Sequence, residues 1–379
     1  MTDFSRRSFL GGMAAATAAT VPLAGLARRA VARSADSAGS GQAGADSAGS
    51  GQAGADQAGA TAASSGARYG SLIDLELCDG CPDRDTPRCV TSCRTANAHR
   101  FPEPDPAKIK DYWPQKRHED WSDRRDVTDR LTPYNWTFVQ AVEVEHEGRR
   151  EEVHVPRRCM HCDNPPCAKL CPFGAAQKRP EGPVTIEENL CMGGAKCRTV
   201  CPWDVPQRQA GVGPYTYLDP LPVGGGVMYK CDLCVDELVA GNTPACAAEC
   251  PRGAIRIGDR DTLFAEAERR AREYGGDRWR EHLYGQNEHG GTSTVYVSRV
   301  PFRAIDAAIV AAGERQREAL AERDPEAAER IRPMRLHETD NMLDRHRGLA
   351  AVSVAAPLLG AAAAFAATVS RLEKGGSDE

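Results

Sequence analysis

The sequence predicts a loop-rich α+β protein made of two similar modules, with a C-terminal transmembrane helix. Two features favour this fold: short strand candidates alternate with cysteine-rich loops, and an uncharged stretch of 21 residues, 349–369, lies near the C-terminus. Aromatic residues make up only 6% of the chain, while 36 glycines and 25 prolines favour loops, so an apolar core alone would hold it poorly. Its 15 cysteines could supply the rest through disulfides or metal. The net charge of −5 argues against a strongly basic nucleic-acid-binding protein, and no nucleic-acid partner is expected.

The cysteines fall into four groups, and each group ends in the spacing Cys-x3-Cys. The first group is Cys78-x2-Cys81-x7-Cys89-x3-Cys93, and the second is Cys159-x2-Cys162-x4-Cys167-x3-Cys171. The third is Cys191-x5-Cys197-x3-Cys201, and the fourth is Cys231-x2-Cys234-x11-Cys246-x3-Cys250. A proline follows the last cysteine of three groups, and no cysteine is left over.

This spacing of cysteines matches the run C-x2-C-x2-C-x3-C-P of bacterial ferredoxins, with insertions before the third cysteine. Closely spaced thiolates on a tight loop can bind one iron–sulfur cluster, while the fourth cysteine, one helical turn later, points to a neighbouring cluster. We therefore expect two ferredoxin-like modules that each hold two clusters. Zinc sites rarely show this asymmetric form, and a disulfide framework is disfavoured by the odd number of cysteines.

The third group lacks one cysteine, because Gly194 stands where the full spacing would place it. Glycine has no ligating side-chain atom, so one corner of that cluster has no protein thiolate. We expect three 4Fe–4S clusters and, at the third group, either a 3Fe–4S cluster or a 4Fe–4S cluster with a non-cysteine fourth ligand. The three-iron form is the one we favour.

Between the cysteine groups the pattern predicts short strands and two helices. Strand candidates lie at 72–77, 184–186, 254–257 and 294–300, a hairpin at 137–145 and 151–155 turns around Gly148, and helical patterns run over 261–273 and 304–329. The stretch 99–130 is rich in charge, proline and tryptophan, which indicates a surface insertion that is solvated by default. Of the histidines His118, His146, His154 and His161, only His161 lies inside a cysteine group, where it could tune a cluster potential through a hydrogen bond.

The two ends of the chain carry targeting patterns. Arg6 and Arg7 precede a weakly apolar stretch, in the context Ser-Arg-Arg-x-Phe-Leu, which is typical of a twin-arginine export signal. A ten-residue unit rich in alanine, glycine and serine then occurs twice over 35–54 and indicates a flexible spacer. At about 1.5 Å per residue, 349–369 would span roughly 31 Å, enough for a bilayer core. We expect a periplasmic protein that contacts the lipid bilayer through this C-terminal anchor.

These observations divide the chain into five parts. They are a signal segment at 1–32, a linker at 33–67, the iron–sulfur domain at 68–260, a C-terminal extension docked on that domain and on partners at 261–345, and the anchor with a short tail at 346–379.

In these motifs the chain resembles the iron–sulfur electron-transfer subunits of periplasmic membrane oxidoreductases. The segment 228–234 is similar to the start of the fourth cysteine group in this family. The segments 282–285, 290–292 and 300–302 resemble those of the HybA-type subunit of nickel–iron hydrogenases, and the β subunit of membrane-bound formate dehydrogenase is a near relative. The resemblance implies that the first group pairs with the fourth and the second with the third. It implies four ligand sets: Cys78, Cys81, Cys89 and Cys250; Cys231, Cys234, Cys246 and Cys93; Cys159, Cys162, Cys167 and Cys201; and Cys191, Cys197 and Cys171.

The resemblance also implies a non-catalytic subunit that relays electrons between a catalytic oxidoreductase subunit and an integral membrane quinone-linked subunit. A self-contained iron–sulfur reductase is a second hypothesis, but it would need a substrate pocket or another cofactor motif, and none stands out. A zinc-stapled membrane scaffold is a third.

Overall fold

The computed structural model describes residues 67–345, apart from 113–114, 219–220, 222, 324, 326–327 and 329–331. The predicted signal segment, the spacer up to residue 66 and the predicted anchor lie outside these residues.

A four-stranded sheet in the order β8-β1-β10-β9 joins the two ends of the described chain. Strand β1 (Tyr69–Asp74) pairs antiparallel with β8 (Ile255–Asp259) and parallel with β10 (Thr294–Val297), which pairs antiparallel with β9 (Leu283–Tyr284). The strands are short and mostly buried, because the two faces of the sheet pack against different layers.

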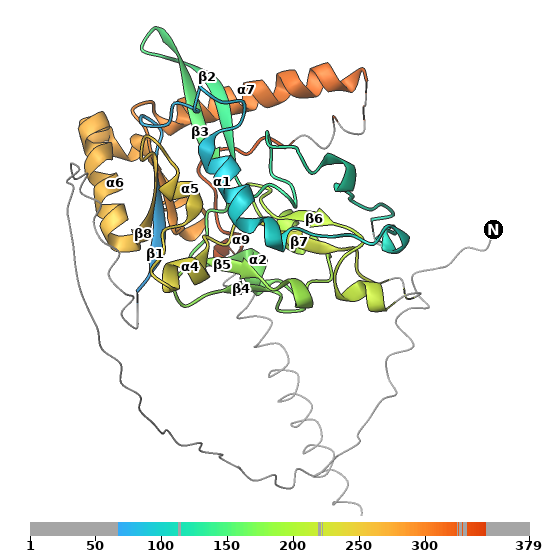
Figure 1. Cartoon of the computed structure of the whole chain (residues 1–379). Helices are drawn as coiled ribbons and strands as arrows, with labels where there is room; N and C mark the ends of the chain where they lie inside the picture. Colours follow the sequence, from blue (N-terminus) through green and yellow to red (C-terminus); the bar gives the residue numbers. More distant parts are fainter. Residues whose placement is uncertain are drawn as a thin grey trace, which may run out of the picture. The chain divides into compact units, whose positions relative to one another are not determined.

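One face of this sheet packs against helix α6 (Arg260–Gly275), which lies beside β1 and β8 in Figure 1. Leu72 and Val295 meet Leu263 and Ala267 there, while Ile73 and Tyr296 belong to the main core on the other face. This alternation follows from the two-residue period of a strand. The main core also contains many of the cysteines, so the sheet backs the candidate sites.

A long hairpin forms a second framework. Strands β2 (Phe138–His146) and β3 (Arg149–Arg157) pair antiparallel, and helix α7 (Phe302–Ala321) contacts β2 (Figure 1). The turn residues Glu147 and Gly148 both have positive φ, at 50° and 72°, as a tight two-residue hairpin turn requires.

The cysteine-bearing segments are short helices beside two small hairpins. Helices α1 (Arg88–Asn97) and α5 (Ala245–Ala248) contact each other, as do α2 (Pro166–Lys169) and α3 (Lys196–Thr199). The remaining strands and α-helices of the described residues are β4 (Ala176–Lys178) paired with β5 (Val184–Ile186), β6 (Gln207–Gln209) paired with β7 (Val227–Tyr229), α4 (Val235–Val239) and α9 (Met342–Arg345).

Most of the predicted elements are confirmed, with shifted ends. The hairpin, the strand at 184–186 and the helix at 261–273 are present, whereas the first strand begins and ends three residues before the predicted 72–77. It stops at Asp74 because the chain turns there toward Cys78, and the Asp74 carboxylate accepts a hydrogen bond from the amide of Glu76 at 3.0 Å.

The predicted fold class is wrong in its C-terminal transmembrane helix. In the part of the chain that the structure describes, no helix is both long enough and apolar enough to cross a membrane. The 20-residue α7 has the length but carries charged residues, Arg303 and Asp306 among them. The predicted span 349–369 lies outside the described residues, so the structure gives no support to an anchor or to its bilayer contact.

Candidate metal-cluster sites

The first candidate site, site I, lies between the first and fourth cysteine groups. Cys78, Cys81, Cys89 and Cys250 line one pocket, whose other walls are largely apolar. Cys89 reaches it from α1, and Cys250 follows α5. The structure thus brings together the four thiols that the resemblance assigned to one cluster.

The second candidate site, site II, lies on the other side of the same helix pair. Cys93, Cys231, Cys234 and Cys246 line one pocket, together with the buried side chain of Arg158. Cys89 and Cys93 are four residues apart on α1, so one helix supplies a thiol to each pocket.

Sites III and IV are built in the same way around α2 and α3. Burial raises the pKa of Cys162, and the neighbouring thiols of Cys201, Cys159 and Cys167 raise it further, which places these four together as site III. Burial likewise raises the pKa of Cys197 to about 12, with contributions from Cys191, Cys167 and Cys171. Cys171, Cys191 and Cys197 form site IV.

The four loops share one backbone feature, which shows which residue stands in place of the missing cysteine ligand. The residue before the second cysteine has positive φ in every loop: Gly80 at 70°, His161 at 52°, Leu233 at 64° and, in the third group, Gly193 at 65°. Gly194 therefore occupies the backbone position of Cys81, Cys162 and Cys234.

The residue after the first cysteine of each group is the same within a pair of groups and differs between the two pairs. Asp79 and Asp232 follow the first cysteine of groups one and four, and each carboxylate accepts a hydrogen bond from the amide of the next cysteine, at 3.0 and 2.9 Å. Met160 and Met192 stand at this position in groups two and three. This alternation is a signal for the pairing that the sequence analysis missed.

The chemistry of the donor set fits iron–sulfur clusters. All 15 cysteines are free thiols, and burial raises the pKa of most of them, for example to about 11 in Cys78 and Cys167 and about 12 in Cys231. Converging buried thiolates need a cationic group to neutralise them, which cluster irons supply. Within the described residues, no three His, Cys, Asp or Glu side chains are arranged to bind a single metal ion.

Several N–H groups point at cysteine sulfur atoms, as is typical around iron–sulfur clusters. The backbone amides of Met228 and Leu233 lie 3.4 Å from the Sγ atoms of Cys191 and Cys231, respectively. The Arg158 guanidinium donates to Cys246 Sγ at 3.6 Å.

His161 connects the two modules. Its Nδ1 atom accepts a hydrogen bond from the amide of Val184 at 3.0 Å, and its Nε2 atom lies 3.8 Å from Cys231 Sγ in site II. Burial, followed by the charges of Lys230 and Arg158, lowers the pKa of His161 well below its ordinary value. The ring is therefore neutral, with its proton on Nε2, and it donates to the sulfur of the neighbouring module.

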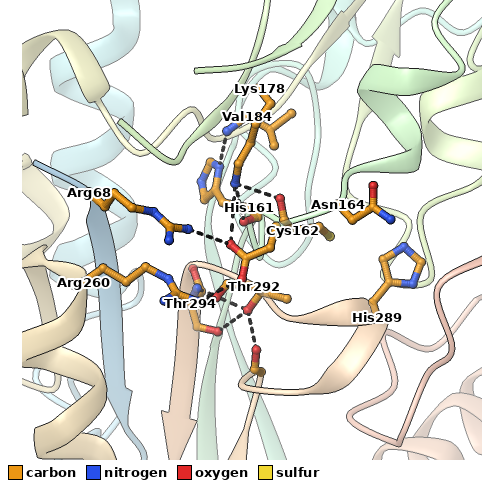
Figure 2. Close-up of polar contacts among 12 residues, drawn as sticks. Arg68, His161, Cys162, Asn164, Lys178, Val184, Arg260, His289, Thr292 and Thr294 are labelled. Carbon is orange, nitrogen blue, oxygen red and sulfur yellow. Dashed lines mark hydrogen bonds and ion pairs between the residues drawn. The ribbon is translucent and has the colours of Figure 1, made fainter. Parts of the chain in front are cut away.

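The loop of the second group is anchored by charged residues (Figure 2). Lys178 donates hydrogen bonds to the backbone carbonyl oxygens of His161 and Cys162, at 3.4 and 2.8 Å. Arg68 and Arg260 each pair with Asp163, at 3.3 and 2.9 Å. These contacts hold the loop against the sheet.

The predicted surface insertion is only partly solvated. Glu119 lies within it and pairs with Arg198 of α3 at 2.5 Å and with the fully buried Arg208 at 2.7 Å. Tyr112, also in the insertion, lies against Gly194. Of the other predicted histidines, His118 pairs with Asp111, His146 ends β2 beside Glu147, and His154 packs against Gly80 in the loop of site I.

Comparison with known proteins identifies the family. Residues 77–175 and 151–260 each match a family model described as a 4Fe-4S dicluster domain. The chain is 32% identical over 268 residues to the Hydrogenase-2 operon protein HybA of Escherichia coli O157:H7, an alignment that covers 62% of this chain and 72% of that protein. The chain belongs to the HybA and formate dehydrogenase β-type family of iron–sulfur electron-transfer subunits.

Two further relatives belong with this family. The Formate dehydrogenase-O iron-sulfur subunit of Escherichia coli K12 is 33% identical over 192 residues, covering 47% of this chain and 59% of that protein. The nitrate-inducible formate dehydrogenase iron-sulfur subunit of the same strain is 29% identical over 244 residues, covering 61% and 68%. The family expected from the cysteine groups is confirmed, and so is the presence of multiple 4Fe–4S clusters.

Proposed function

We propose that this subunit relays electrons between a catalytic oxidoreductase subunit, of the hydrogenase or molybdopterin type, and a quinone-linked membrane subunit. On this proposal the chain does not catalyse a reaction by itself. The names of its relatives support the catalytic partner, since they are an operon protein of hydrogenase-2 and iron-sulfur subunits of formate dehydrogenases.

The observation that carries the proposal is the unbranched order of the four sites. Cys89 of site I and Cys246 of site II belong to one cluster of packed, buried side chains. His161 and Cys231 bring sites II and III together. Cys197 of site IV neighbours Cys167 of site III. Sites I, II, III and IV therefore form one row, as an electron relay needs.

We assign the ligands by these sites. Site I would hold its cluster through Cys78, Cys81, Cys89 and Cys250, site II through Cys93, Cys231, Cys234 and Cys246, and site III through Cys159, Cys162, Cys167 and Cys201. Cys171, Cys191 and Cys197 would hold a 3Fe–4S cluster at site IV. Such clusters supply one-electron transfer, and the protein's part is to hold them close, bury them and direct N–H groups and charges at their sulfur atoms.

We also propose that the folded, cluster-loaded chain reaches the periplasm by the twin-arginine route. The pair Arg6-Arg7 and its context support this. A route that carries folded proteins suits a chain whose buried thiols must be loaded with metal before export.

Interrupting the row tests the proposal. In the complex purified from its own host, Cys234→Ala at site II should leave the reduction of a soluble viologen dye by the catalytic partner within about twofold of wild type. Reduction of a quinone analogue should fall by at least about tenfold, because electrons can no longer pass through site II between site I and site III. Equal quinone reduction in both complexes, with iron lost from the variant, would refute the relay. Substrate turnover by the isolated chain would favour the reductase hypothesis instead.

A further inference from the structure

The backbone at Gly194 can accept a side chain. Its φ lies outside the left-handed region, unlike that of Gly193, so nothing in the backbone demands glycine there. The absence of a thiol at this position therefore needs another explanation, and the atoms that face it provide one.

The hydroxyl of Tyr112 faces the position of the missing cysteine. A Cβ atom built on Gly194 would lie 3.5 Å from Tyr112 Oη, and among the described residues outside its chain neighbours no other heavy atom would lie within 4 Å. Within the same residues the hydroxyl makes no hydrogen bond to protein. The Tyr112 hydroxyl is therefore the described protein atom nearest to the position that a fourth ligand would occupy, and it is free to donate a hydrogen bond there.

Tyr112 is held in this place by its surroundings. Its amide donates to the carbonyl oxygen of Arg117 at 3.0 Å, closing a tight turn, and its ring lies 5.5 Å from the guanidinium carbon of Arg208. A Cβ atom at Gly225 would lie 2.9 Å from Tyr112 Cβ, so glycine there makes room for the tyrosine.

The charges near this corner oppose a further cation. Arg208 is fully buried and donates to the carbonyl oxygen of Gly193 at 3.0 Å, directly beside Gly194. Among the described residues its one carboxylate partner is Glu119, which Arg198 shares. The Arg208 guanidinium thus lies beside the corner where a fourth Fe²⁺ would have to bind, and its charge repels a cation there.

We propose that Tyr112 determines the nuclearity of the site IV cluster: its phenol group fills the corner next to Gly194, donates a hydrogen bond into it and keeps a fourth iron out. This inference rests on the proposed three-iron cluster at site IV. A protonated phenol is a hydrogen-bond donor and a far poorer iron ligand than a thiolate.

Iron uptake tests this role. Dithionite reduces a 3Fe–4S cluster by one electron, and addition of Fe²⁺ then gives a 4Fe–4S cluster of charge 2+, so that the spin-half resonance of the three-iron form does not return on reoxidation. In the wild-type complex that resonance should persist after this treatment. Tyr112→Ala should take up iron and lose the resonance about tenfold faster, the factor that one hydrogen bond of ordinary strength represents.

Tyr112→Phe is the matched variant, because it keeps the ring that packs against Gly225 and removes only the hydroxyl. It should load normally and shift the midpoint potential of the spin-half centre to lower values, since a donor to the cluster is lost. Uptake in Tyr112→Ala at the wild-type rate, or an unchanged potential in Tyr112→Phe, would overturn the inference while leaving the three-iron cluster in place. If the oxidised wild-type complex shows no spin-half resonance but Tyr112→Phe does, Tyr112 is an iron ligand. That result would refute both this inference and the three-iron assignment. A protein without cluster absorption would refute the proposed function itself.

Discussion

Arg158→Met should lower the reduction potential of the site II cluster. Arg158 is 2% exposed and lines that pocket, and its guanidinium donates to Cys246 Sγ. Burial alone would lower the pKa of Arg158, but the neighbouring Cys246 and Cys231 hold it above its ordinary value. A buried positive charge stabilises the more negative, reduced form of a cluster, so its removal favours the oxidised form.

The structure sets a ceiling on the size of this shift. At the 3.6 Å separation of Arg158 Nη1 and Cys246 Sγ, two unit charges at an effective dielectric constant of about 20 interact by about 4.6 kcal/mol. For a one-electron couple, 59 mV corresponds to about 1.4 kcal/mol, so the ceiling is roughly 200 mV. The added electron is spread over a cluster farther from the guanidinium than this sulfur, and we expect a decrease of about 50–100 mV.

A redox titration followed by electron paramagnetic resonance measures this potential, and Arg157→Met provides the control. Arg157 is equally buried, but its guanidinium donates to the carbonyl oxygen of Met334 and is surrounded by Tyr296, Tyr284 and Asp306 rather than by thiols. It should shift the potential far less. Equal shifts in both variants, or a rise in Arg158→Met, would refute the reasoning.

Three further predictions concern other parts of the chain. In Gly194→Cys the new thiolate is a far stronger iron ligand than the Tyr112 phenol, which lies 3.5 Å from the Cβ position, and should displace it; iron should then rise by about one atom per chain and the spin-half signal should vanish. Gly193→Ala, with φ at 65° and a Cβ 2.5 Å from Gly226, should instead lose site IV iron. Glu119→Gln should lower the free energy of unfolding by about 2 kcal/mol at pH 7, measured by thermal or denaturant unfolding. Burial would raise the pKa of Glu119, but its arginine partners lower it overall. The stabilisation is therefore present above about pH 4.3, the pKa in the unfolded chain, and is lost as the pH falls through the lower pKa of the folded protein. Unchanged stability in the variant would contradict the pairing. Replacing Arg6 and Arg7 by lysine should retain a cluster-loaded protein in the cytoplasm, seen by cell fractionation, and normal export would contradict the twin-arginine route.

The sequence predicts the cluster loops well because their chemistry is local. Cysteines at fixed short spacings define each loop, and Gly194 stands out since three complete groups show what is missing. The grouping of the thiols was implied by the family resemblance, although the Asp79 and Asp232 positions carry the same information.

The residues around the loops could not be predicted, because long-range packing brings them there. Tyr112 is 82 positions from Gly194, and Arg158 reaches Cys246 across 88 positions. His161 was expected to lie near a cluster, but the sequence does not show which sulfur its ring meets, because Cys231 is 70 positions away. The predicted anchor at 349–369 lies outside the described residues.

The most direct test of the account is the metal and sulfide content of the purified chain, read together with its resonance spectrum. Three 4Fe–4S clusters and one 3Fe–4S cluster require about 15 iron and about 16 sulfide per chain, with one spin-half resonance in the oxidised protein. That result is what the four sites predict. Zinc without sulfide, or about eight iron per chain from a single module, would contradict the row of four clusters on which the proposed function depends.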